Sequence, residues 1–113
     1  MKALVDTSVL FLPFDEHFNL SLKLKDYELF ITSYVLDEFF RIVLKRKLKR
    51  MDEYIKNFQV IEAEVGTLTV DEALIRDAKV LDATLVTGDL GLVKIAKGKV
   101  PVLFYSKNRF IEN

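Results

Sequence analysis

The sequence predicts one α/β domain over residues 1–113, with helices on both faces of a central parallel sheet of four or five strands. Three observations support this three-layer α/β/α class. Short apolar runs typical of buried strands alternate with segments of helical periodicity, and the connections are short. A chain of 113 residues can bury a core without disulfides. Its composition, 50% hydrophobic and 30% charged, is that of a globular protein rather than a disordered one.

The first predicted element is a strand over Ala3–Val5, because a central parallel strand is covered on both faces and forms a continuous apolar run. Asp6 follows it directly. An ionised carboxylate at the tip of a buried strand has to be satisfied, and two interpretations are open. Asp6 caps a short helix beginning at Thr7, or it binds a cation at the carboxyl end of the sheet, where open α/β folds place their ligands.

The next elements lead to a long helix. Pro13 ends any short helix after Asp6, and a further helix is expected around Phe18–Leu24. A second strand is predicted over Glu28–Thr32, after which Ser33 is expected to cap a helix that reaches Leu48. The predicted apolar face of this helix consists of Leu36, Phe39, Phe40, Val43 and Leu44.

Glu38 lies off that apolar face. At spacings of three and seven it shares one side of the helix with Arg41 and Lys45. These residues either form helical ion pairs worth about 0.2–0.5 kcal/mol each, or Glu38 is a metal-binding carboxylate beside cations that hold a phosphate backbone.

In the second half of the chain, predicted strands and helices alternate as in the first half. Thr69 and Glu72 have the spacing of a capping box, and Asp71 lies in the first turn, where the helix dipole favours an anion. Asp77 is expected in solvent. Pro101 lacks a backbone donor, so the last strand starts late or lies at an edge. The expected order is helix Met51–Phe58, strand Gln59–Ala63, helix Thr69–Leu81 with Asp82 at its end, strand Thr84–Thr87, helix Leu90–Ala96 and strand Val100–Tyr105.

Four acidic residues occupy related positions in this order. Asp6 and Asp89 follow strands, Glu38 opens a helix after a strand, and Asp71 begins another helix after a strand. Each has its own structural explanation as a cap, an ion-pair partner or a dipole partner. Because the carboxyl ends of parallel strands meet at one edge of a sheet, all four could nevertheless meet there.

The composition excludes several kinds of chemistry. There is no cysteine, and the single histidine, His17, is expected at the surface. The four glycines form no dinucleotide-binding or Walker fingerprint. A phosphotransfer enzyme with an aspartate nucleophile is disfavoured because Ser8 stands where a second aspartate is usual. No signal peptide or membrane span is expected, so the expected location is the cytoplasm.

Charge is unevenly distributed although the formal net charge is zero. Six of the 17 basic residues lie between Arg41 and Arg50, which leaves a net charge of −6 on the rest of the chain. This basic run either contacts a polyanion or is a solvated helix face.

The order of several segments resembles the PIN-domain nucleases, including the VapC-type toxins. These segments are VDTSVL at the start, VLDEF around Glu38, VDEALIRDAKVLDATLVTGD and a closing KVPVLFY. The resemblance implies a PIN-like fold and an acidic catalytic and metal-binding set of Asp6, Glu38, Asp71 and Asp89, with Ser8 and Thr87 as supporting hydroxyls. Glu72 is an alternative to Asp71.

The predicted function is that of a metal-dependent endoribonuclease. Carboxylate oxygens suit Mg²⁺ or Mn²⁺, and crowding acids together should raise their pKa values in the absence of metal. RNA is expected to contact Arg41, Lys45, Arg46 and Lys49. The enzyme would be either a toxin held by an antitoxin protein or an RNA-processing enzyme. The alternative is a PIN-like module that binds RNA or protein with weak or absent catalysis.

A homodimer is also expected. Surplus apolar side chains on the long helix, among them Tyr34 and Ile42, point away from its predicted core face, and such surplus usually marks an interface. Relatives within the family that the sequence resembles commonly pair as two-fold dimers.

Overall fold

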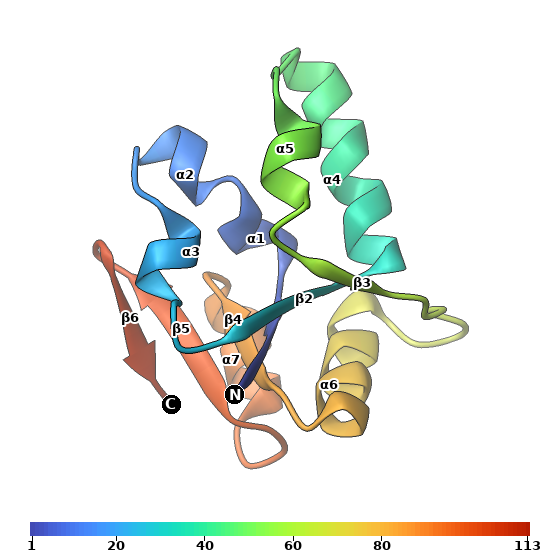
Figure 1. The fold of residues 1–113 in the computed structure, drawn as a ribbon. Helices are drawn as coiled ribbons and strands as arrows, with labels where there is room; N and C mark the ends of the chain where they lie inside the picture. The colour runs from blue at the N-terminus through green and yellow to red at the C-terminus, as the bar shows by residue number, and fades with distance from the viewer.

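The computed structural model describes all 113 residues, which form a six-stranded sheet with helices on both faces (Figure 1). The strand order is β3-β2-β1-β4-β5-β6; the first five strands are parallel and β6 is antiparallel to β5. The predicted α/β class and parallel sheet are confirmed, while the sixth strand was not predicted. The strands are β1 Lys2–Val5, β2 Glu28–Thr32, β3 Gln59–Ile61, β4 Thr84–Thr87, β5 Val102–Ser106 and β6 Arg109–Glu112.

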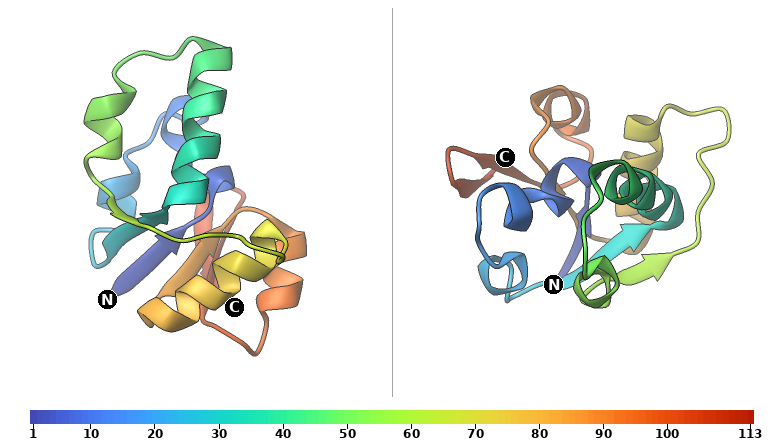
Figure 2. Two further views of the ribbon diagram at one scale, coloured as in Figure 1. Left: turned by 90° about the vertical axis from the view of Figure 1, so that its right-hand side faces the viewer. Right: turned by 90° about the horizontal axis from the view of Figure 1, so that it is seen from above.

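Seven helices connect these strands. The chain moves outward from β1 to β3, then returns to β4 and continues to β5 on the other side of β1. Because such crossovers are right-handed, α6 and α7 cover one face of the sheet and α1 to α5 the other (Figure 2). The helices are α1 Thr7–Leu10, α2 Leu12–Asp15, α3 Leu20–Lys23, α4 Ser33–Arg46, α5 Met51–Ile55, α6 Val70–Leu81 and α7 Leu90–Ala96.

The topology places a switch point between β1 and β4, where the direction of strand succession reverses. Open α/β sheets bind ligands in the crevice that forms outside the carboxyl ends of the strands at this point. Asp6 follows β1 and Asp89 lies just beyond β4, so these two acids flank the switch point.

The core lies on both sides of the two central strands. All of Ala3, Leu4 and Val5 are fully buried in β1, as are Leu85 and Val86 in β4. This explains why β1 has a continuous apolar run rather than an alternating pattern.

The packing of α4 differs from the prediction in its cap and its face. Thr32 caps the helix, since its Oγ1 accepts a hydrogen bond from the Val35 N–H at 3.3 Å. Ser33 is already helical and bonds to Ala63 instead. The helix ends at Arg46, two residues before Leu48, because Lys47 adopts a left-handed conformation.

The core face of α4 is defined by Val35, Phe39 and Val43, spaced four residues apart. Of the predicted face, Phe40 is 40% exposed and Leu44 is 78% exposed. The helix is therefore rotated from the predicted orientation: the prediction joined Phe39 and Val43 to Phe40 and Leu44, which lie on a neighbouring, more exposed stripe.

Asp77 was predicted to lie in solvent, and this is wrong. Its side chain is only 12% exposed, accepts the Tyr34 hydroxyl at 2.7 Å and pairs with Arg76 at 2.9 Å. Tyr34 lies 43 residues earlier in the sequence, so the periodicity of α6 alone could not reveal this contact.

Several other local predictions are confirmed. Thr69 and Glu72 form the capping box of α6, and Asp82 ends that helix in a left-handed conformation. The strand after Pro101 starts late, at Val102, but it is not an edge strand because β6 pairs with it. The prediction that Pro13 ends a helix is wrong: α1 already ends at Leu10, and Pro13 lies in the first turn of α2. No helix is both long and apolar enough to cross a membrane.

Candidate active site

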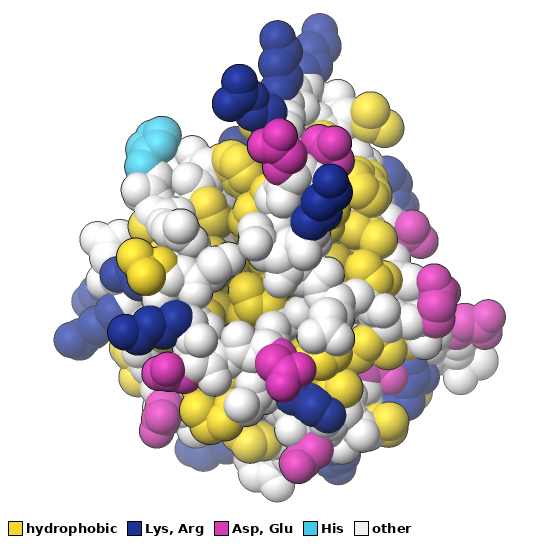
Figure 3. All heavy atoms as spheres, in the orientation of Figure 1, with side chains coloured by type: hydrophobic (Ala, Val, Ile, Leu, Met, Phe, Trp, Pro, Cys, Tyr) yellow, Lys and Arg dark blue, Asp and Glu magenta, His cyan; other side chains and the backbone are white.

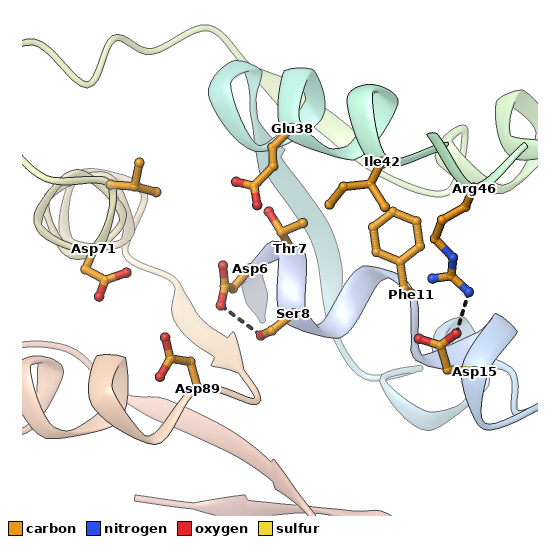
Figure 4. Close-up of a pocket in the computed structure, with 11 residues that line it drawn as sticks. Asp6, Thr7, Ser8, Phe11, Asp15, Glu38, Ile42, Arg46, Asp71 and Asp89 are labelled. Atoms are coloured by element: carbon orange, nitrogen blue, oxygen red, sulfur yellow. Dashed lines mark hydrogen bonds and ion pairs between the residues drawn. The ribbon is translucent and has the colours of Figure 1, made fainter. Parts of the chain in front are cut away.

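The four predicted carboxylates line one open cavity of about 580 Å³ at the carboxyl ends of the strands (Figure 4). They come from four different segments: the end of β1, the second turn of α4, the first turn of α6 and the start of α7. The structure therefore brings together acids that are up to 83 residues apart in the sequence. These residues are Asp6, Glu38, Asp71 and Asp89.

Asp6 does not cap α1 with its side chain. Its Oδ2 instead accepts two hydrogen bonds of 2.8 Å, from the hydroxyls of Ser8 and Thr87. Ser8 Oγ also accepts the Gly88 N–H at 3.0 Å. This network joins the ends of β1 and β4 and orients the Asp6 carboxylate, so both predicted supporting hydroxyls lie directly against it.

Asp89 has a structural role and also lines the cavity. Its Oδ1 accepts the Gly91 N–H at 2.8 Å and so caps α7, while its own N–H donates to Thr87 Oγ1 at 3.0 Å. The second oxygen of the carboxylate has no hydrogen bond within the protein, so the cap leaves it available to a ligand.

Asp71 and its neighbour Glu72, which the sequence left as alternatives, make different contacts in the structure. Glu72 is used by the capping box: its Oε1 accepts the Thr69 N–H at 2.9 Å, which lowers the pKa of the Glu72 carboxyl. Asp71 faces the cavity. Burial, together with the negative charges of Asp89 and Asp6, raises the pKa of the Asp71 carboxyl.

Glu38 forms no ion pair, so the structure does not support the ion-pair explanation for this residue. The Arg41 guanidinium instead donates to the backbone carbonyl of Asp37 at 3.4 Å. The Glu38 carboxylate points from α4 toward Thr7 and Asp6 (Figure 4).

Thr7 belongs to this cavity and was missed in the sequence. It is only 7% exposed, and its Oγ1 is the one buried side-chain polar atom that has no hydrogen-bond partner. In Figure 4 this oxygen lies between the carboxylates of Glu38 and Asp6. A buried hydroxyl without a partner is unfavourable by about 1–3 kcal/mol, so this atom indicates that the cavity is completed by something other than protein.

The donor set has the chemistry of a site for a hard divalent cation. Every candidate donor is a carboxylate or hydroxyl oxygen, as Mg²⁺ and Mn²⁺ prefer, and no cation is paired with the four acids. No three of the acidic side chains, however, converge closely enough to hold a metal ion in this conformation. The residues thus fit such an ion in donor type and charge, while the side chains stand wider apart than a closed ligand shell.

The predicted RNA-binding residues divide into two groups. Arg46 lines the cavity, whereas Arg41, Lys45 and Lys49 are exposed outside it. Lys and Arg side chains gather at the top of the molecule, over the end of α4 and the turn that follows (Figure 3).

Comparison with known proteins identifies the fold. No family model matches the sequence, and no curated protein matches it. Among solved structures, the chain is similar to the PIN domain endonuclease Utp24, with a TM-score of 0.73 and 15% identity over 99% of this chain and 90% of that one. It is also similar to PAE2754 from Pyrobaculum aerophilum, with a TM-score of 0.63 and 21% identity over 88% of this chain and 90% of that one. The chain therefore has the fold of the PIN domains.

Proposed function

We propose that this protein is a metal-dependent endoribonuclease that hydrolyses RNA phosphodiester bonds. The observation that carries the proposal is the cavity itself, which four carboxylates from four segments line together with Thr7, whose hydroxyl has no partner. The endonuclease Utp24, which shares the fold, supports a nuclease function for this chain.

Each acidic residue has a distinct part in the proposed site. Asp6, Glu38, Asp71 and Asp89 would hold Mg²⁺ or Mn²⁺, which when bound supplies charge neutralisation at the phosphate and a more acidic water. Ser8 and Thr87 fix the Asp6 carboxylate by donating to one of its oxygens, which leaves the other toward the cavity. Asp89 is held in place by the start of α7.

The substrate would enter along the basic end of α4. Arg41, Lys45, Arg46 and Lys49 would neutralise phosphates of a single-stranded or structured RNA, and the salt dependence of binding would report how many they contact. In a cell, the enzyme would act in the cytoplasm, either as the toxin of a toxin–antitoxin pair or in RNA processing.

The test is cleavage of a labelled RNA with Mg²⁺ or Mn²⁺, with EDTA as the metal-free control. Asp6→Asn should reduce the rate at least about 100-fold, because preorganised charge at the reacting phosphate is lost. Two pairs of variants test whether the loss of cleavage is specific to acids that line the cavity. Glu38→Gln is compared with Asp37→Asn, and Asp71→Asn is compared with Glu72→Gln. Only the first member of each pair should abolish cleavage. Equal activity of Asp6→Asn and wild type would refute the proposal.

A second candidate function is a PIN-like module that binds RNA or protein with weak or absent catalysis. The spacing of the acidic side chains favours it, since no three of them converge on one point. The two functions separate in a single experiment. A wild-type protein that binds RNA in EDTA, yet cleaves nothing when Mg²⁺ or Mn²⁺ is added, is a binding module.

A further inference from the structure

Arg46 is the only basic side chain among the residues that line the cavity, where it accompanies five carboxylates. It lies at the opposite end from the four candidate metal ligands, and Phe11 and Ile42 lie between the two ends (Figure 4). Glu38, Ile42 and Arg46 occupy successive turns of α4, so the α-carbons of Glu38 and Arg46 are about 12 Å apart along the helix axis. The cavity therefore has an acidic end and a separate end that carries one cation.

Two contacts fix the Arg46 guanidinium. Its Nη2 donates to Asp15 Oδ1 at 2.7 Å, and its Cζ lies 5.4 Å from the centre of the Phe11 ring. Phe11 is itself buried and stacked on Phe39 at 5.0 Å, so it is a rigid platform. The Phe11 ring belongs to the core, whereas the ion pair is open to solvent: the Arg46 side chain is 38% exposed and the Asp15 side chain is 50% exposed.

We propose that Arg46 forms a phosphate subsite that Asp15 occupies when RNA is absent. On binding, a phosphate of the RNA chain, distinct from the one at the acidic end, takes the place of the Asp15 carboxylate on the guanidinium. This inference rests on the proposed ribonuclease function, which supplies the polyanion.

The chemistry of the two partners favours this exchange. A guanidinium carries five N–H donors in a planar fork, and the bond to Asp15 uses one of them. A phosphodiester offers two oxygens to the fork, which gives a bidentate contact. Solvent-exposed ion pairs are weak, so Asp15 is readily displaced. Phe11 continues to support the guanidinium after Asp15 has been released, so the subsite keeps its shape.

A double-mutant cycle on RNA affinity tests the exchange. Binding of a fluorescent single-stranded RNA is measured in EDTA, so that cleavage does not interfere. Asp15→Asn should tighten binding by about two- to fivefold, the range expected for loss of an exposed competing ion pair. Arg46→Gln should weaken binding. Asp26→Asn, which removes the same charge from an exposed residue outside the cavity, is the control for net charge.

The double-mutant cycle shows whether Asp15 competes with an RNA phosphate for Arg46 or only repels RNA through its negative charge. If Asp15 acts through Arg46, then Asp15→Asn in the Arg46→Gln background should tighten binding no more than Asp26→Asn does. An equal gain in both backgrounds would mean that Asp15 repels RNA only through its charge. Weaker binding by Asp15→Asn would mean that Asp15 positions Arg46 rather than competes with RNA. Either result overturns the proposal.

A second measurement separates the subsite from the nuclease function. The Nε–Hε resonance of Arg46 is followed by NMR while inorganic phosphate is added to wild type and to Asp15→Asn. The subsite requires the resonance to shift, and to shift at lower phosphate concentration in Asp15→Asn. This response without any RNA cleavage would reject the ribonuclease while supporting the subsite; RNA cleavage without the response would reject the subsite alone.

Discussion

Thr7 shows how a single side chain can report on function. Its hydroxyl is buried and unpartnered beside two carboxylates, which is unfavourable unless a ligand completes the site. Replacing such a group by an apolar one of similar shape can be neutral or stabilising. We therefore expect Thr7→Val to raise the free energy of unfolding of the metal-free protein by about 1 kcal/mol while it reduces RNA cleavage.

Thr32 is the matched control, measured by the same urea denaturation. Its hydroxyl is also buried but accepts the Val35 N–H as the cap of α4. Thr32→Val should therefore lower stability by about 1 kcal/mol. If Thr7→Val were equally destabilising, the Thr7 hydroxyl would have a partner and would not mark an incomplete site.

Asp71 should make stability depend on pH. Its pKa is raised by burial and by the charges of Asp89 and Asp6. The folded state therefore holds a proton on this group more tightly than the unfolded state. The associated stability is fully present below the unfolded pKa, about 3.9, and is lost as the pH rises through the folded pKa.

It follows that Asp71→Asn should raise the melting temperature of the protein in EDTA at pH 7, and that this gain should disappear below about pH 4. Added Mg²⁺ should stabilise wild type more than the variant. The control is Glu72→Gln, which should lower the melting temperature at pH 7 because the capping box favours the ionised form of that residue. A gain independent of pH would exclude charge repulsion as its cause.

At the scale of elements, α4 combines three functions on different sides. One side packs through Phe39 against Phe11 and Tyr54, its cavity side carries Glu38 and Arg46, and its last turn and the residues beyond it are basic. The basic residues outside the cavity should act only on affinity. Lys45→Gln with Lys49→Gln should weaken RNA binding and reduce the slope of log affinity against log salt by about 1.4, or 0.7 for each lost contact with a single strand.

The control for this prediction is Lys94→Gln with Lys97→Gln, which changes the same charge on and just after α7, on the other face of the sheet. Its effect on the slope should be near zero. A slope unchanged in the Lys45 and Lys49 variant would identify the basic run as a solvated helix surface.

The whole molecule is expected to form a homodimer, but the structure leaves other residues available for its interface than the sequence predicted. The Tyr34 hydroxyl donates a hydrogen bond to Asp77 within the same chain, and Ile42 lines the cavity. The surplus apolar surface of α4 is instead a stripe of Leu36, Phe40 and Leu44, four residues apart, of which the last two are exposed. Exposed apolar stripes of this kind favour association.

We expect a dimer in sedimentation velocity at tens of micromolar protein, roughly the range where a weak dimer should still form. Leu44→Glu should convert it to a 13.1 kDa monomer. Val80→Glu should leave it intact, although Val80 is 83% exposed, because Val80 lies on α6 across the sheet. A wild-type monomer at these concentrations would contradict the prediction.

Most of the elements, and the kinds of residue at the site, could be predicted from local patterns in the sequence. Apolar run length identified the buried strand β1, and strand–helix alternation indicated the parallel sheet. The capping box of α6 was predictable because its partners lie three residues apart. The same order of elements allowed Asp6, Glu38, Asp71 and Asp89 to meet at one edge, since all parallel strands end there, and the resemblance to PIN-domain nucleases selected these four acids as the candidate site.

Features that depend on contacts between distant segments could not be predicted, because those contacts exist only in the folded chain. The bonds from Thr87 to Asp6, from Tyr34 to Asp77 and from Arg46 to Asp15 join residues 31 to 81 positions apart. Local periodicity carries no information about such partners, nor about the rotation of α4 that exposes Leu44. The unpartnered hydroxyl of Thr7 is likewise visible only after packing, because a polar atom lacks a partner only once its neighbours are in place.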